Sequence, residues 1–158
     1  HDEKPTNSFL YSLVMDTYSF GYSSSGFSDM PMNHKIFLAQ FDAIKKLAGE
    51  GPCVMVGRCA DYALADWNDC FSIFVPADLD WRINRIASKH GKTPKEAKDM
   101  ITKTDKSRAS YYNYYTNKKW GAARSYNLCI DSSKLGIDYA IEAIIESIKI
   151  FDRTKISK

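Results

Sequence analysis

Three short apolar runs without charged residues constrain this chain more than any other feature. They span residues 52–56, 71–75 and 128–130, and segments with a helical spacing of apolar residues lie between them. Such runs are typical of strands buried on both faces, which occur in parallel sheets covered by helices. We therefore predict an α/β fold: a three-layer parallel sheet with helices on both faces.

Helix signals surround these runs. Apolar residues at helical spacing predict helices over residues 33–48, 79–90, 94–115 and 138–148. The third has the strongest start, because Thr93, Pro94 and Glu96 occupy the cap, first-turn and capping-box positions. Residues 9–15 predict a further helix, and residues 19–31, rich in Gly, Ser and Asp, predict a loop.

The composition is that of a globular protein. The chain has 158 residues, 44% hydrophobic and 26% charged, so we expect one domain over residues 1–158 and exclude a disordered chain. No apolar run reaches the roughly 18 residues of a membrane-spanning helix. The spacing of cysteines and histidines matches no metal site. We expect the cysteines to be reduced and buried, which favours a cytoplasmic location: Cys53, Cys59, Cys70 and Cys129.

The net charge of +3 conceals a strongly basic segment. Residues 82–124 hold 12 Lys and Arg against three Asp and Glu, a net charge of +9, whereas the rest of the chain carries −6. Positive charge this concentrated favours an anionic partner, either phosphate groups or a nucleic acid. A solvated helix face explains the lysines equally well. The arginines favour phosphate, because their planar donor forks match its oxygens.

Arg58 and Asp61 are the first candidate site residues. They directly follow the first apolar run, at the predicted carboxyl edge of the sheet, where ligands of α/β proteins bind. Arg can hold a phosphate, and Asp can accept hydrogen bonds from a sugar or a base. A surface ion pair is an equal alternative.

The basic segment supplies the second group of candidates. Asp105 and Arg108 share a helix face, as do Arg82 and Arg85 on the preceding helix, although surface ion pairs are again the alternative. The tyrosines at 111–115 suit base stacking or core packing, and we favour packing. No spacing suits a Ser-His-Asp triad or a carboxylate pair. The pattern favours phosphate chemistry, which depends on positioning and charge neutralisation.

A Gly-x-x-x-x-Gly spacing, as in phosphate-binding loops, occurs once, at residues 21–26. Phe27 stands where such a loop requires Lys, and Pro31 opposes the helix that should follow. We interpret these residues as a flexible loop that binds no nucleotide.

Several segments, taken in order, resemble the cytidylate kinase-like family. They are residues 56–62 (VGRCADY), 77–79 (ADL) with Arg82 and Arg85, 104–112 (TDKSRASYY), 128–133 (LCIDSS) and 135–138 (LGID). The resemblance covers nearly the whole chain. It implies a P-loop NTPase fold of the nucleoside monophosphate kinase type, and transfer of the γ-phosphoryl group of ATP to CMP or dCMP with Mg²⁺.

The resemblance also implies roles for the candidate residues. Arg58 and Asp61 would belong to the acceptor-nucleotide site. Arg108, together with Arg85, would act in catalysis by clamping the phosphates during transfer. Asp105 would contact the acceptor's sugar or orient the arginines.

The basic segment acquires a role as well. Residues 82–124 would form the lid and its flanking helices, and Arg82, Lys103 and Lys106 would face the donor phosphates. Residues 5–50 would form a helical region on the acceptor side. The implied partners are ATP and a nucleoside monophosphate, without a membrane or nucleic acid, and Mg²⁺ is the implied cofactor.

The chain departs from the family's pattern in three places. In well-known bacterial cytidylate kinases the Asp directly follows the Gly-Arg pair, whereas Cys59 and Ala60 intervene here. Those enzymes also carry Arg where this chain has Ile101, so Lys103 or Lys106 is the expected substitute. The family's Gly-rich ATP loop, with the first strand and helix, precedes the matched region. We expect these elements before His1, and expect residues 1–158 alone to be inactive.

Two alternatives stay open on the sequence. The +9 segment suits a non-catalytic module that binds nucleic acid or nucleotide, although no Gly/aromatic RNA-binding motif is present. The second alternative is a degenerate kinase relative that acts as a partner protein.

Overall fold

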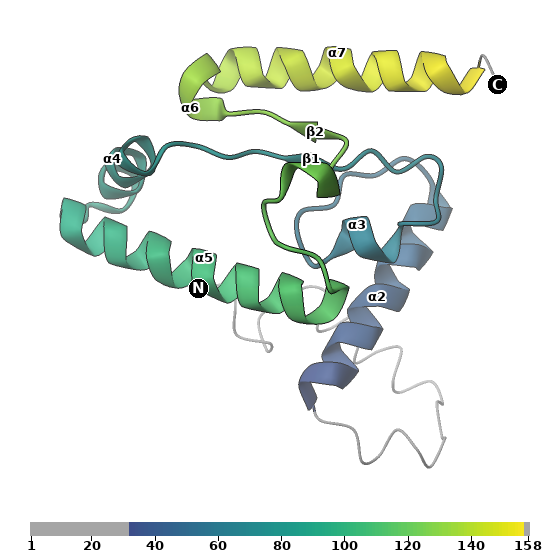
Figure 1. Ribbon diagram of the computed structural model, residues 1–158, viewed down its shortest axis with the longest axis horizontal. Coiled ribbons are helices and arrows are strands. Elements are labelled where there is room, and N and C mark those ends of the chain that lie inside the picture. Colours follow the sequence, from purple (N-terminus) through teal and green to yellow (C-terminus); the bar gives the residue numbers. More distant parts are fainter. Residues whose placement is uncertain (1–31, 157–158) are drawn as a thin grey trace. The chain divides into compact units, whose positions relative to one another are not determined.

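The computed structural model of the protein describes residues 32–156 (Figure 1). Its elements are α2 (Met32–Glu50), α3 (Ala60–Ala63), β1 (Ile73–Phe74), α4 (Leu79–His90), α5 (Pro94–Thr116), the 3-10 helix η2 (Ala123–Ser125), β2 (Leu128–Cys129), α6 (Ser132–Leu135) and α7 (Ile137–Ile156). The chain divides into two compact units, residues 1–68 and 69–158. The predicted helix at 9–15 and the predicted loop at 19–31 lie outside the described residues, as does part of the 5–50 region.

The sheet is much smaller than the sequence predicts. β1 and β2 are parallel and pair Ile73 with Leu128 and Phe74 with Cys129, and the described chain is otherwise mostly helical. The prediction of a three-layer parallel sheet of the P-loop NTPase type is therefore wrong. A sheet of two strands, each two residues long, does not form the central layer that helices on both faces require.

The first apolar run accounts for the error. Residues 52–56 form no strand, and Val54 and Val56 are 94% and 89% exposed. An apolar run indicates a preference for burial, but a strand also needs a neighbouring edge for its backbone N–H and C=O groups. Within residues 32–156, β1 and β2 pair with each other and not with this run.

The four helix predictions that fall on the described residues are confirmed. α2, α4 and α5 lie within a few residues of their predicted bounds, and α7 continues to Ile156. α5 begins with the predicted capping box, in which the Glu96 N–H donates to Thr93 Oγ1 (3.3 Å) and the Thr93 N–H donates to Glu96 Oε2 (2.8 Å). The hydrogen bonds from the Thr93 hydroxyl and backbone N–H lower the pKa of Glu96. Local signals were therefore sufficient to place these helices.

In the first unit, α3 packs against α2. The residues buried on α2 share one face of the helix: Phe37, Gln40 and Ile44. The ring of Phe41 meets Tyr62 of α3 edge-on, with 6.2 Å between ring centroids. This packing holds the turn before α3, which carries Arg58.

In the second unit, aromatic rings pack beside the sheet. Phe74 stacks on Tyr126 with centroids 5.0 Å apart and meets Trp120 edge-on at 5.4 Å. Tyr126 lies at 6.4 Å from Tyr112 of α5, whose burial confirms core packing for this member of the tyrosine cluster. Gly121 is needed here, because its φ is 75° and a Cβ would lie 3.2 Å from the Phe74 ring.

The cysteines differ from the expected pattern. Cys59 is buried, Cys70 is half-buried, and Cys53 and Cys129 are exposed, so the expectation of burial is wrong for the last two. Cys53 is exposed for the same reason as Val54 and Val56: residues 52–56 form no strand. None of the helices described for residues 32–156 is long and apolar enough to cross a membrane.

Candidate functional site

The packed face of α5 is interrupted by charge. The buried residues of this helix share one face: Ala97, Ile101, Tyr112 and Thr116. By helical spacing, Asp105 and Arg108 lie on the same face, between the two buried pairs. Asp105 is half-buried, whereas Arg108 is exposed. The middle of this face is therefore open to solvent and charged, so a polar ligand can reach Arg108 there.

Asp105 faces an arginine of the neighbouring helix. Arg82 of α4 donates from Nη1 to Asp105 Oδ2 (2.7 Å) and from Nη2 to Asp105 Oδ1 (2.8 Å). The pair is bidentate, and its two side chains are 30% and 26% exposed. The structure therefore joins two of the predicted site residues, 23 positions apart, to each other.

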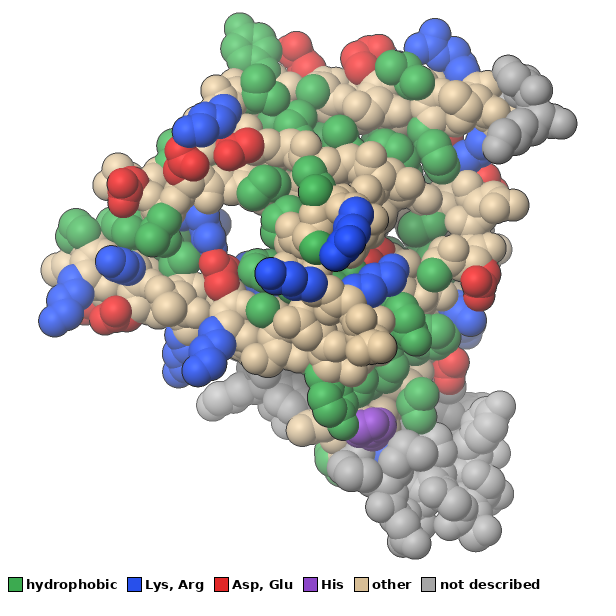
Figure 2. Space-filling model, viewed as in Figure 1, with side chains coloured by type: hydrophobic (Ala, Val, Ile, Leu, Met, Phe, Trp, Pro, Cys, Tyr) green, Lys and Arg blue, Asp and Glu red, His purple; other side chains and the backbone are tan. Residues whose placement is uncertain are grey.

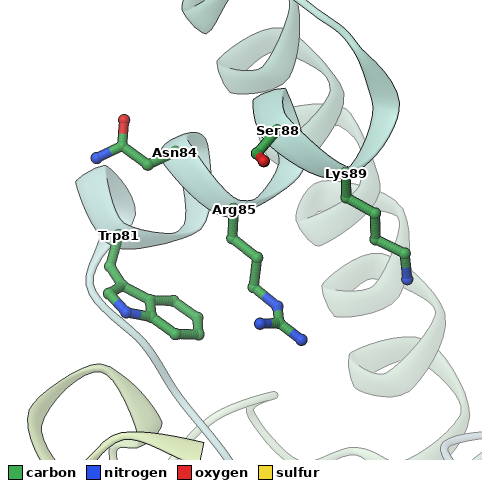
Figure 3. A pocket seen from close by; sticks show the side chains of 5 residues that line it. All are labelled: Trp81, Asn84, Arg85, Ser88 and Lys89. Atoms are coloured by element: carbon green, nitrogen blue, oxygen red, sulfur yellow. The ribbon is translucent and has the colours of Figure 1, made fainter.

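Arg85 lies one turn further along α4, in a hollow of about 530 Å³ lined by Trp81, Asn84, Arg85, Ser88 and Lys89. Its guanidinium group is 5.4 Å from the centroid of the Trp81 ring, within cation–π range. In Figure 3 the side chains of Trp81, Arg85 and Lys89 extend from the same side of α4, while Asn84 points away from them. The lining holds two cations and no acidic side chain, which suits an anion.

Lys103 and Lys106 lie elsewhere on α5. Both are exposed, and the helical spacing places them away from the face that carries Asp105 and Arg108. Figure 2 shows Lys and Arg side chains on the surface of this part of the chain, with some Asp and Glu among them. Most of the cations of the +9 segment lie on α4 and α5, and Lys118, Lys119 and Arg124 follow α5. The lysines of α5 contribute a positive potential rather than a shared contact.

Arg58 and Asp61 belong to the first unit. Three successive residues before α3 have left-handed backbone angles: Gly57 (φ 70°), Arg58 (φ 55°) and Cys59 (φ 55°). For the two non-glycine residues this conformation costs about 1–2 kcal/mol each. Packing compensates, because Cys59 and Ala60 are buried, and Arg58 is left half-buried before the first turn of α3, where Asp61 lies. Strain of this kind is concentrated at functional sites, which supports Arg58 as a ligand contact.

Cys59 is expected to resist alkylation at pH 8, while Cys53 and Cys129 react. Burial, and then the negative charge of Asp61, raises the pKa of Cys59 to about 12, so only about one molecule in ten thousand carries the thiolate at that pH. Iodoacetamide labelling followed by peptide mass spectrometry measures the three rates. Labelling in denaturant should make the rates equal, and equal rates in the native protein would show that the turn before α3 opens freely.

The loops that follow β1 and β2 are tied together, which the sequence analysis did not predict. The Ser132 N–H donates to the carbonyl of Pro76 (3.0 Å), the Asp78 N–H donates to Ser133 Oγ (2.9 Å), and Lys134 pairs with Asp78. The Ser133 hydroxyl also donates to Asp131, which lowers the pKa of that carboxyl group. These bonds fix the start of α4 at the carboxyl edge of the sheet. The sequence signal was the polar Asp-Ser-Ser after an apolar run.

Residues 32–156 contain no group of three His, Cys, Asp or Glu side chains able to hold a metal ion. Arg58 is half-buried in the turn before α3, whereas Arg85 and Arg108 are exposed, and these three arginines are the candidate phosphate ligands.

Comparisons with known proteins agree with the resemblance noted in the sequence. A family described as the cytidylate kinase-like family matches residues 1–134. The structure is similar to a crystal structure of an uncharacterized protein from Eubacterium ventriosum ATCC 27560, with a TM-score of 0.77 and 31% sequence identity, covering 90% of this chain and 81% of that one. No curated protein matches the sequence.

Proposed function

Because this chain belongs to the cytidylate kinase-like family, we propose that the protein transfers the γ-phosphoryl group of ATP to CMP, dCMP or a related nucleoside monophosphate. The family indicates a nucleotide kinase-like activity. The choice of donor and acceptor is our proposal.

The observation that carries the proposal is the charged interruption in the packed face of α5. Arg108 occupies a position between buried residues that would normally be filled by an apolar side chain, yet it is exposed. An arginine there has no role in packing. Phosphoryl transfer needs such a group, because charge spreads over the equatorial oxygens of the transferred phosphoryl in the transition state.

The reaction has a simple balance. An oxygen of the acceptor's phosphate bonds to the γ-phosphorus as the bond from that phosphorus to the β–γ bridging oxygen breaks, which gives ADP and a nucleoside diphosphate. In our proposal Arg108 and Arg85 neutralise the phosphates, and Arg58 and Asp61 hold the acceptor. Mg²⁺ arrives bound to ATP, and Lys103 and Lys106 attract the complex through their positive charge.

The test is an assay of the product of the complete gene with Mg-ATP and one nucleoside monophosphate at a time. We expect ADP formation that depends on the acceptor and is fastest with CMP or dCMP. Absence of ADP with every acceptor would contradict the proposal. Binding of single-stranded RNA that weakens steeply with salt would then favour the nucleic-acid module, since the affinity would come from phosphate contacts.

A further inference from the structure

We propose that Arg82 and Asp105 are a positioning pair, which fixes α4 on α5 and so holds Arg85 in place relative to Arg108. This inference rests on the proposed function. It assigns Arg82 and Asp105 to each other, whereas the family resemblance implied that Arg82 faces the donor phosphates and that Asp105 contacts the acceptor's sugar or orients the arginines.

Arg82 and Asp105 meet in a bidentate contact. The two terminal nitrogens of Arg82 donate to the two oxygens of Asp105, at 2.7 and 2.8 Å. This is the arrangement with which arginine holds a phosphate, so the carboxylate already occupies the donor fork. A nucleotide that used Arg82 would have to displace a charge-assisted, half-buried partner.

α4 lies against α5, but none of its residues is fully buried. The apolar contact between the two helices is therefore partly open to solvent on the α4 side. Both members of the Arg82–Asp105 pair are at most 30% exposed. At least one side chain is more than half exposed in each of the pairs Lys134–Asp78, Lys149–Glu146, Lys155–Asp69 and Lys155–Asp152. A less solvated pair loses less of its attraction to screening. The Arg82–Asp105 pair is therefore a principal contact between the two helices.

The pair lies at the charged interruption in the packed face of α5. Asp105 lies one turn beyond the buried Ile101 and one turn before Arg108, and the face is buried again at Tyr112. On α4, Arg85 follows Arg82 by one turn, about 4.5 Å along the axis. Movement of α4 would displace Arg85 from Arg108, and a displacement of about 1 Å can lower the rate of a positioned reaction about a hundredfold.

The experiment compares Arg82→Lys, Asp105→Asn and the exchanged double variant Arg82→Asp with Asp105→Arg. The matched control is Glu146→Gln, which removes the exposed i,i+3 pair with Lys149 on α7. Steady-state kinetics give kcat and the KM for ATP and acceptor, and hydrogen exchange reports the protection of α4. The two single variants replace similar side chains, so we expect them to fold.

For each single variant we expect a fall of about tenfold to a hundredfold in kcat, a change below about threefold in both KM values, and exchange about tenfold faster in α4. The exchanged variant should recover part of the protection and of kcat, and the control should change neither. If Asp105→Asn raises the KM for the acceptor and leaves hydrogen exchange in α4 unchanged, the proposal is overturned, because Asp105 would then contact the nucleotide. The proposal is also overturned if the exchanged double variant recovers neither kcat nor the protection of α4 relative to the single variants.

The hydrogen-exchange arm separates this inference from the proposed function. A wild-type product of the complete gene that forms no ADP contradicts the kinase assignment, whatever the exchange results. Unchanged α4 exchange in both single variants contradicts the positioning pair, even when the wild type is an active kinase.

Discussion

Replacement of Arg108 with alanine is expected to lower kcat about a thousandfold or more while the protein stays folded. An arginine that neutralises charge in phosphoryl transfer contributes about 10³–10⁵ in rate, because the charge on the transferred group is largest in the transition state. Arg108 is exposed, so its loss leaves no cavity in the core. The measurement is ADP formation with saturating Mg-ATP and acceptor, together with the thermal midpoint of unfolding.

Two further variants sharpen this prediction. Arg124→Ala removes another exposed arginine of the basic segment, so it separates the loss of net charge from the loss of Arg108 itself and should lower kcat far less than Arg108→Ala does. Arg108→Lys keeps the charge but loses the planar fork, and should recover only part of the rate. Activity of Arg108→Ala within about tenfold of wild type would remove Arg108 from the phosphoryl-transfer site.

Replacement of Ile101 with arginine is expected to destabilise the second unit by more than about 3 kcal/mol, because it places an unpaired charge in a packed position. Ile101 is 5% exposed on the packed face of α5. Well-known bacterial cytidylate kinases, which this sequence resembles, carry arginine at the corresponding place. In this protein that substitution should therefore fail to add a functional cation. Urea denaturation followed by circular dichroism gives the free energy of unfolding.

The controls separate burial from helix propensity. Thr102→Arg introduces the same side chain at the next, exposed position of α5 and should change stability by no more than about 0.5 kcal/mol. Ile101→Val removes one methylene group and should cost about 1 kcal/mol. A stable Ile101→Arg protein would mean that α4 and α5 separate easily at this point, which would also weaken the case for the Arg82–Asp105 pair.

The helices could be predicted because their signals are local. The capping box at Thr93 and the left-handed Gly91 each depend on atoms within a few residues, so the sequence contains the whole cause. The sequence also predicted that the arginines at 82, 85 and 108 lie on two successive helices and that Asp105 and Arg108 share a helix face. The family resemblance drew on the same residues and was confirmed.

The sheet and the partners of the site residues could not be predicted in this way. Residues 52–56 and 71–75 are similar apolar runs, yet only the second contributes a strand, because only it meets β2. The Arg82–Asp105 contact joins residues 23 positions apart, and either side chain has the chemistry to bind a nucleotide instead. Nothing in the local pattern distinguishes these outcomes.

The sequence by itself determined the helices, the basic segment and the family, because these follow from short-range hydrogen bonds, periodicity and residue identity. The tertiary structure alone decided that Ile101 is packed, that Arg108 is exposed between buried neighbours, and that Arg82 is held by Asp105. These are properties of surfaces brought together from distant parts of the chain. Their free energies depend on which groups lose contact with water, and that is settled only when the helices meet.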